Sequence, residues 1–383
     1  MTATRAKLRN DELSSLQQAP SESVVEPSSF WRIRRALSSL DSRRLTRKDV
    51  PLQDLRGKWV IASGSNSGIG REAALSFAQC GASIILACRN PPPHEENPAV
   101  VVTECNVASQ AAGHEDAVIE WWETDMTKLS TVNAFATRWL ETGRSLDILC
   151  NNAGIGGNPG DGKGGILKTE DGFEIVHQVN FLSHCLLTLR LLQSLAKAAE
   201  PRVVFTTSCN MFFGTFDLNK FNGEGCSGED FYCNNKLFLQ VWLTELQLRL
   251  SASEHYSHIM VNGVHPGCTN TNMWHIDREP GWVNWMRYLS ESLLVKTLVS
   301  LFGISAEQGS YAIIHAATIT WSGSGINAQQ AKDNAGCHGG KYFNRIWETE
   351  PMPYCHDPGS RLLVWKKVLE ELDFVWKHSL DTF

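Results

Sequence analysis

Two residues four positions apart, Tyr232 and Lys236, form a pair that could move a proton. In a helix this spacing places both side chains on one face. A tyrosine hydroxyl has a pKa of about 10, and a neighbouring ammonium stabilises the phenolate and lowers that pKa. Such a tyrosine can protonate a carbonyl oxygen as hydride arrives, or accept the proton in the reverse direction. A tyrosine and a lysine at this spacing often occur by chance, so the neighbouring motifs must show whether the pair is catalytic.

A glycine-rich loop lies between an expected strand over 58–62 and an expected helix over 68–79. Glycines allow a tight turn and let the backbone approach a pyrophosphate, which then lies at the positive end of the following helix. This strand–turn–helix context predicts dinucleotide binding. The loop residues expected to contact the dinucleotide are Gly64, Ser65, Asn66, Ser67, Gly68, Ile69 and Gly70.

Arg89 follows the second expected strand, 83–88, at the position where the type of dinucleotide is read. A ribose 2′-hydroxyl requires a carboxylate there, whereas a 2′-phosphate requires a cation. The segment Ala87-Cys88-Arg89-Asn90 contains no acid, and Arg89 could form a charge-assisted contact with the phosphate. We therefore predict NADP as the cofactor. The alternative is that Arg89 is a solvated residue at the end of the strand.

The elements that must position these residues alternate along the chain. Strands are expected over 58–62, 83–88, 118–123, 146–151, 202–207 and 258–264, and helices over 68–79, 128–141, 173–199 and 230–252. The strands are apolar throughout, which is typical of a parallel sheet that is covered by helices on both faces. The expected fold is α/β, a Rossmann-type doubly wound parallel sheet that forms one domain over residues 51–383.

Three segments depart from this pattern. Residues 1–50 are Ser-rich and predict a loosely ordered extension with a short helix near 29–40, for which peripheral membrane contact is the alternative. Residues 90–116 carry several prolines and predict an irregular insertion in place of a helix. Residues 268–305 carry many large apolar side chains and predict a lid over the substrate.

Composition narrows the classes of function. The 383 residues include 35 Lys and Arg against 41 Asp and Glu, and a net charge of −6 argues against a nucleic-acid partner. No apolar run is long enough to predict a transmembrane segment, and the N-terminus does not resemble a secretory signal. The 11 cysteines form no CxxC pair, so we expect no metal site and a reduced, intracellular, cytoplasmic protein.

Taken in order, these motifs resemble those of the short-chain dehydrogenase/reductases over residues 55 to about 345. Three segments, SNSGIG at 65–70, ACRN at 87–90 and GKYF at 340–343, resemble those of the retinol-dehydrogenase-like branch of the family, in particular its fungal members. The matching pieces are SGSNSGIG at 63–70, ACRN at 87–90, Asp125-Met126, Asn151-Asn152-Ala153-Gly154, Asn180, Ser208, Tyr232-x-x-x-Lys236 and His265-Pro266-Gly267 with Thr271.

The resemblance implies four catalytic roles. Tyr232 would be the general acid/base, and Lys236 would hold the nicotinamide ribose and lower the pKa of that tyrosine. Ser208 would hydrogen-bond the substrate oxygen, with Thr207 as the alternative residue. Asn180 would anchor a water in the proton relay.

The resemblance also implies cofactor contacts outside the glycine loop. Asp125 would accept from the adenine amino group, next to Met126. Asn152 would line the cofactor loop after the fourth strand. Thr271 would touch the nicotinamide carboxamide or the phosphates. The other contacts expected from the matching motifs are Ala153, Gly154, Pro266 and Gly267.

The function expected from these residues is that of an NADP-dependent oxidoreductase. The apolar lid predicts a bulky hydrophobic substrate such as a polyketide, terpenoid, steroid or retinoid, as for a ketoreductase of secondary metabolism. Two alternatives stay open: a non-catalytic dinucleotide sensor, and a non-redox isomerase or dehydratase on the same fold. The direction of the reaction and the formation of a homo-oligomer stay open as well.

Overall fold

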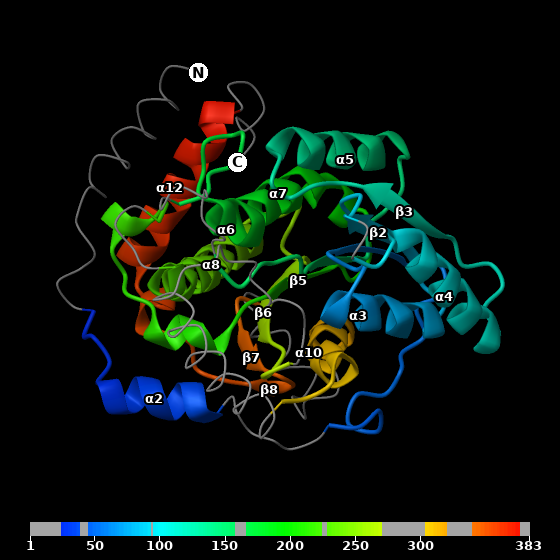
Figure 1. Ribbon diagram of the computed structural model, residues 1–383, viewed down its shortest axis with the longest axis horizontal. Coiled ribbons are helices and arrows are strands. Elements are labelled where there is room, and N and C mark those ends of the chain that lie inside the picture. The colour runs from blue at the N-terminus through cyan, green and yellow to red at the C-terminus, as the bar shows by residue number, and fades with distance from the viewer. Residues whose placement is uncertain are drawn as a thin grey trace, which may run out of the picture.

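The computed structural model describes residues 24–38, 45–92, 95–157, 166–223, 228–269, 303–319 and 339–375. Within these ranges, strands form one sheet in the order β3-β2-β1-β4-β5-β6-β7-β8 (Figure 1). The pairs from β3 to β7 are parallel, and β8 is antiparallel to β7. The strands are β1 (Trp59–Ser63), β2 (Ser83–Cys88), β3 (Ile119–Glu123), β4 (Ile148–Asn151), β5 (Arg202–Thr206), β6 (Met260–His265), β7 (Tyr342–Asn344) and β8 (Trp347–Glu348).

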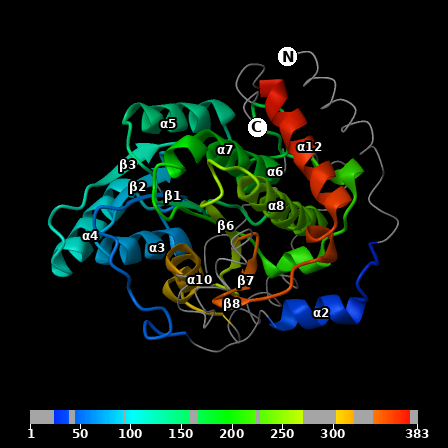
Figure 2. The ribbon, with the colours of Figure 1, turned by 180° about the vertical axis from the view of Figure 1, so that it is seen from behind.

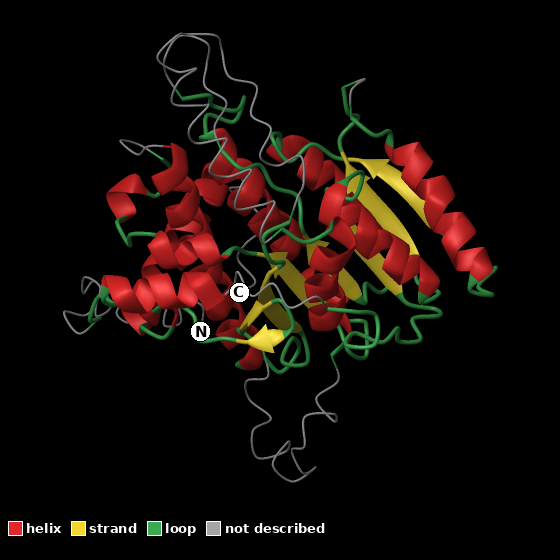
Figure 3. Cartoon of the chain, turned by 60° about the horizontal axis from the view of Figure 1, so that its bottom comes forward, coloured by secondary structure: helices red, strands yellow, loops and turns green. Residues whose placement is uncertain are grey.

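Helices cover both faces of this sheet (Figures 2 and 3). One face carries α5 (Leu129–Glu141), α7 (Ser183–Leu195) and α8 (Gly228–Ser251). The other face carries α3 (Gly68–Gln79), α4 (Pro98–Ala111) and α10 (Ala306–Thr318). A further helix, α12 (Pro358–Val375), packs along α8. These layers form the Rossmann-type α/β fold that the sequence predicts.

Strand residues explain why both faces need a cover. In β1, Val60 and Ala62 pack into the core beneath α3 and α10, whereas Ile61 packs into the core beneath α5 and α7. The strand is therefore apolar on both sides, as in other parallel sheets. The strand order reverses between β1 and β4, and ligands of such sheets bind outside the carboxyl ends of the strands at this point.

The irregular insertion expected over residues 90–116 is instead largely helical. Helix α4 begins at Pro98, and the Asn97 side chain caps it by accepting from the Ala99 N–H at 2.9 Å. Proline at the first helical position costs little, because its missing N–H would have no partner inside the helix there. The prediction of an irregular segment was wrong because it treated Pro98 as a helix breaker.

The single helix expected over 173–199 is interrupted. It consists of α6 (Ile175–His177), a π-helical turn η1 (Gln178–Leu182) and α7. The turn contains Asn180, one of the predicted catalytic residues. Such π-turns occur frequently at functional sites.

The short helix expected near 29–40 is present as α2 (Ser29–Ser38). It packs on a 3-10 helix, η2 (Cys209–Phe213), where the rings of Trp31 and Phe212 meet edge to face at 5.7 Å. The Arg32 guanidinium donates to the Gly214 backbone oxygen at 2.8 Å. The described part of the N-terminal segment is thus attached to the body of the protein, unlike the loosely ordered extension that we expected.

One helical stretch of the described chain, Ile175–Leu195, is long and apolar enough to cross a membrane. Of its most apolar window, 89% is buried inside the protein. Core helices of soluble proteins pass the same test, so this stretch is weak evidence for a membrane span.

Candidate active site

The predicted proton donor and its partners meet at the end of β5. Tyr232 and Lys236 lie on α8 with exposed fractions of 5% and 4%, and the Tyr232 hydroxyl is hydrogen-bonded to Ser208. Lys236 Nζ donates to the Thr206 backbone oxygen at 2.8 Å and lies 5.7 Å from the centre of the Tyr232 ring. The helix spacing and the strand end therefore bring the three side chains together.

Burial sets the protonation of this group. It raises the pKa of Tyr232, and the hydrogen bond from Ser208 opposes that rise only in part. Burial also lowers the pKa of Lys236 to about 8. Loss of hydration therefore moves the pKa of Tyr232 in the direction opposite to the lowering that we expected from Lys236. The Tyr232 hydroxyl is therefore protonated at pH 7.

Ser208 rather than Thr207 faces the tyrosine. Thr207 Oγ1 is buried without a hydrogen-bond partner in the described structure, and its methyl group lies against Gly263. Ser208 Oγ accepts from the Asn210 N–H at 3.2 Å and reaches Tyr232. This geometry favours Ser208 over the alternative Thr207.

The Asn180 amide holds the loop after β4. Its Oδ1 accepts from the Ile155 N–H at 2.8 Å, and its Nδ2 donates to the Ile155 oxygen at 2.9 Å. Both ends of the side chain are therefore committed to backbone. The water-anchoring role of Asn180 stays a prediction, and the side chain itself is seen to fix the backbone at Ile155.

The glycine loop fits a dinucleotide. A Cβ on Gly64 would lie 2.7 Å from Ala153 Cα, and one on Gly70 would lie 2.3 Å from the Gly64 oxygen, so larger residues are excluded. The Asn152 amide donates to the Ser63 oxygen at 3.2 Å. Ser67 precedes α3 without a side-chain capping bond. The first N–H groups of α3 can therefore bind a pyrophosphate.

Sequence reasoning missed the link between this loop and the helix of Asn180. Ser63 Oγ accepts from the backbone N–H groups of Asn152 and Ala153 at 2.9 and 3.0 Å. It also lies 3.0 Å from His184 Nε2, and His184 Nδ1 lies 3.4 Å from the Asn180 backbone oxygen. The hydroxyl of Ser63 thus joins the glycine loop to the loop after β4 and to the helix of His184. No local motif marks His184, because its partner is 121 residues away.

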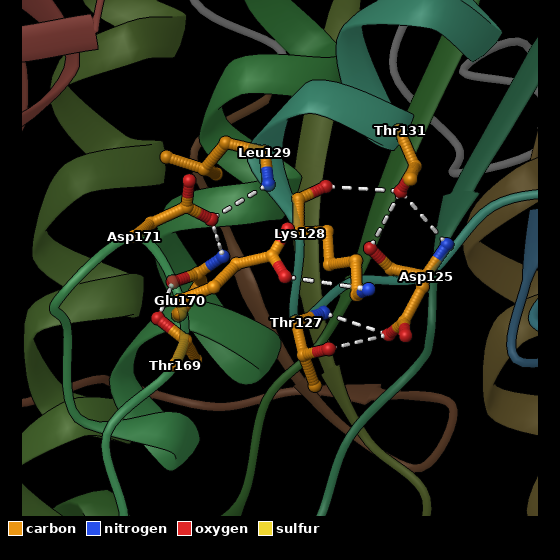
Figure 4. A network of polar contacts seen from close by, with 9 residues as sticks. Asp125, Thr127, Lys128, Leu129, Thr131, Thr169, Glu170 and Asp171 are labelled. Carbon is orange, nitrogen blue, oxygen red and sulfur yellow. Dashed lines mark hydrogen bonds and ion pairs between the residues drawn. The ribbon is translucent and has the colours of Figure 1, made fainter.

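The Asp125 loop is braced from two sides (Figure 4). Asp125 Oδ1 accepts from the Thr127 N–H and hydroxyl at 2.9 and 2.8 Å. Further along, Asp171 accepts from the Leu129 N–H at 2.9 Å and from Gln178 Nε2, on η1, at 2.7 Å. The Asp125 carboxylate, which we expect to accept from the adenine amino group, is thus fixed by hydrogen bonds to Thr127 in the same turn. Beside it, the Met126 backbone oxygen accepts from Ser183 at 2.7 Å.

Arg89 is half exposed just beyond β2 and pairs with Glu95 at 2.5 Å. Nearby, Asn66 Nδ2 lies 3.4 Å from the Glu96 oxygen. A cation is therefore present where a 2′-phosphate would bind, although a carboxylate already neutralises it. Sequence reasoning did not identify Glu95 as this partner.

Pro266 and Gly267 are buried beyond β6, and Thr271 lies outside the described residues. The neighbouring His265 has its pKa lowered to about 3 by burial, by Arg345 and by Lys236. Burial and Lys236 likewise lower the pKa of His184 to about 3. Both imidazoles are therefore neutral near pH 7.

A dinucleotide loop beside a buried tyrosine, serine and lysine defines an oxidoreductase of the Rossmann class. The family model described as short chain dehydrogenase matches residues 58–280, more than half of the chain. The chain belongs to this family, in its retinol-dehydrogenase-like branch.

Two human relatives illustrate the likeness. The chain is 32% identical to Retinol dehydrogenase 14 over 254 residues, which cover 64% of this chain and 68% of the relative. It is 29% identical to Retinol dehydrogenase 13 over 315 residues, which cover 81% and 82%. A crystal structure of an uncharacterized protein from Mycobacterium paratuberculosis has a TM-score of 0.55 at 24% identity, covering 84% and 95%, and supports the fold alone.

Proposed function

We propose that this oxidoreductase uses NADPH to reduce a carbonyl group of a bulky hydrophobic molecule. The observation that carries the proposal is the buried Tyr232 hydroxyl bonded to Ser208, with Lys236 one turn further along the same helix. A bound nicotinamide would supply the hydride. Ser208 would hold the substrate oxygen while the proton of Tyr232 moves to that oxygen.

The experiment is coenzyme consumption with a panel of bulky ketones, aldehydes and alcohols, with identification of the products. Tyr232→Phe should lower turnover at least about a hundredfold while coenzyme binding persists. Binding without turnover by the unaltered chain would instead support a dinucleotide sensor. A changed substrate without net coenzyme oxidation would support an isomerase or dehydratase.

The preference for NADP rests on Arg89 and on the lack of an acid in the segment 87–90. Glu95 pairs with this arginine, so the phosphate would have to displace or share it. Dissociation constants for NADPH and NADH test this part of the proposal separately from turnover.

The hydrophobic substrate class rests on two observations. Apart from Ser208 and Lys236, Tyr232 packs in a cluster of apolar side chains: Ile155, Ile175, Val176 and Phe231. The relatives named above are retinol dehydrogenases, whose name denotes a hydrophobic alcohol. The expected lid, 268–305, lies almost wholly outside the described residues. Its Trp274→Ala variant should weaken a large substrate by about 1 to 3 kcal/mol and small ones much less.

We further propose a cytoplasmic protein. The exposed side chains of Phe30, Ile33 and Leu37 on α2 support the peripheral membrane contact considered for residues 29–40. Flotation with lipid vesicles tests this contact, and light scattering tests the homo-oligomer.

A further inference from the structure

A histidine outside the predicted tetrad lies at the junction of three helices. His177 ends α6, three residues before Asn180, and its side chain is fully buried. Its ring is enclosed by the aromatic rings of Phe173, Phe181, Phe221 and Phe231, with centroid separations of 5.1 to 6.4 Å. In such surroundings each ring nitrogen requires a hydrogen-bond partner, because hydration is lost.

Both nitrogens of His177 have one. Nε2 lies 2.7 Å from Glu371 Oε2, on α12, and Nδ1 lies 3.3 Å from Asn235 Nδ2, on α8. A carboxylate only accepts, so the proton lies on Nε2 and points to Glu371. Nδ1 is then the acceptor for the Asn235 amide. Glu371 thereby fixes the form of His177 that can hold Asn235.

Asn235 directly precedes Lys236 and follows Tyr232 by three residues. The contact therefore reaches the catalytic helix between its two catalytic side chains. Elsewhere α12 lies along α8 (Figures 1 and 2). There Trp365 stacks on Trp242 at 5.7 Å, and Arg361 pairs with Glu245 at 3.1 Å.

We propose that His177 and Glu371 are positioning residues, which hold α8 so that the Tyr232 hydroxyl meets Ser208. The inference rests on the proposed reductase function. The π-turn with Asn180 begins immediately after His177, so the same histidine also joins this turn to α8. Small displacements of a proton donor cost turnover more than they cost coenzyme binding, because only turnover requires the exact reacting geometry.

Three variants of α12 test the proposal. Glu371→Leu removes the acceptor, Glu371→Gln retains an oxygen that can accept from Nε2, and Glu370→Leu is the matched control. Glu370 is 67% exposed and pairs only with Lys367 among the contacts described for it, at 3.6 Å. We expect Glu371→Leu to lower kcat at least about tenfold with KM for the coenzyme changed by less than about threefold. Glu371→Gln should recover most of kcat, and Glu370→Leu should match the original chain.

Unfolding measurements keep the test decisive. His177→Phe and Glu371→Leu should each lower the unfolding midpoint. In the double variant the two losses should not add, because both substitutions remove the same contact. This result is expected whether or not activity changes. Non-additive midpoints with unchanged kcat in folded Glu371→Leu would overturn positioning and leave a structural pair. A kcat for Glu371→Gln as low as for Glu371→Leu would also overturn it. If the original chain turns over no carbonyl substrate, the proposed function itself fails. The non-additive unfolding midpoints would still demonstrate the contact between His177 and Glu371.

Discussion

Lys236 Nζ donates to the backbone oxygen of Thr206 at 2.8 Å, so the ammonium is anchored to the end of β5 one turn away from Tyr232. The lysine is buried, and burial lowers its pKa from 10.5 to about 8. Its charge also contributes to the low pKa of His184 and of His265. Burial is the main reason that both imidazoles stay neutral, and the charge of Lys236 adds to it.

This burial predicts a pH dependence of stability. Between pH 8 and 10.5 the unfolded lysine holds its proton while the folded one has lost it, so the unfolded state binds more protons and stability rises with pH. The free energy of unfolding of the original chain, minus that of Lys236→Met, should grow by about 3 kcal/mol across this range. Urea titrations at several pH values measure the difference. A difference that does not change with pH would contradict the assignment.

The neighbouring residues Ser208 and Thr207 provide a matched pair for the next prediction. Ser208→Ala removes the hydroxyl that contacts Tyr232 and should lower kcat about a hundredfold. Thr207→Val preserves shape and removes a hydroxyl without a described partner, so kcat should stay within about threefold. Steady-state kinetics decide between them. The reverse ranking would assign the substrate contact to Thr207.

The parts of the fold that follow from local pattern were predictable from sequence. Apolar runs such as Ile84–Leu86 identify strands that are buried on both faces, and the glycine loop identifies the turn after β1. The prolines misled us over 90–116, because the capping role of Asn97 depends on where the helix begins. Strand β7 contains only three residues, too few for a periodic signal.

The parts of the site that depend on distant contacts were not predictable. The four expected catalytic residues, Asn180, Ser208, Tyr232 and Lys236, come from the family resemblance, and their roles stay a prediction. The contact between His177 and Glu371 joins residues 194 positions apart, and no local pattern marks either residue. The same holds for burial, which reversed the expected direction of the pKa of Tyr232.

The ion pair of Arg89 with Glu95 predicts opposite effects of two substitutions on coenzyme affinity. Arg89→Gln should weaken NADPH about tenfold, corresponding to about 1.4 kcal/mol, and leave NADH nearly unchanged. Glu95→Gln removes the competing carboxylate and should tighten NADPH severalfold. Fluorescence titration gives both dissociation constants for each variant. An unchanged ratio in Arg89→Gln would place the reading of the phosphate elsewhere, for example at Asn66.

Helix α2 supplies the last prediction through two adjacent aromatic residues. Trp31 packs on Phe212, which lies in the 3-10 helix that follows Ser208. The Arg35 guanidinium lies 5.2 Å from the centre of the Trp31 ring. Phe30 beside it is 75% exposed. Trp31→Ala should therefore lower the free energy of unfolding by about 1 to 3 kcal/mol, whereas Phe30→Ala should change it by less than about 0.5 kcal/mol.

Thermal and urea unfolding of both variants measure these changes. Because η2 begins directly after Ser208, Trp31→Ala should also lower kcat at a temperature where the protein remains folded, and Phe30→Ala should not. Equal and negligible effects of the two substitutions would show that α2 does not dock on η2 in solution. A deletion of residues 1–45 would then leave stability and turnover unchanged. With α2 docked, the same deletion removes the contacts of Trp31 and Arg32 and should cost at least as much stability as Trp31→Ala.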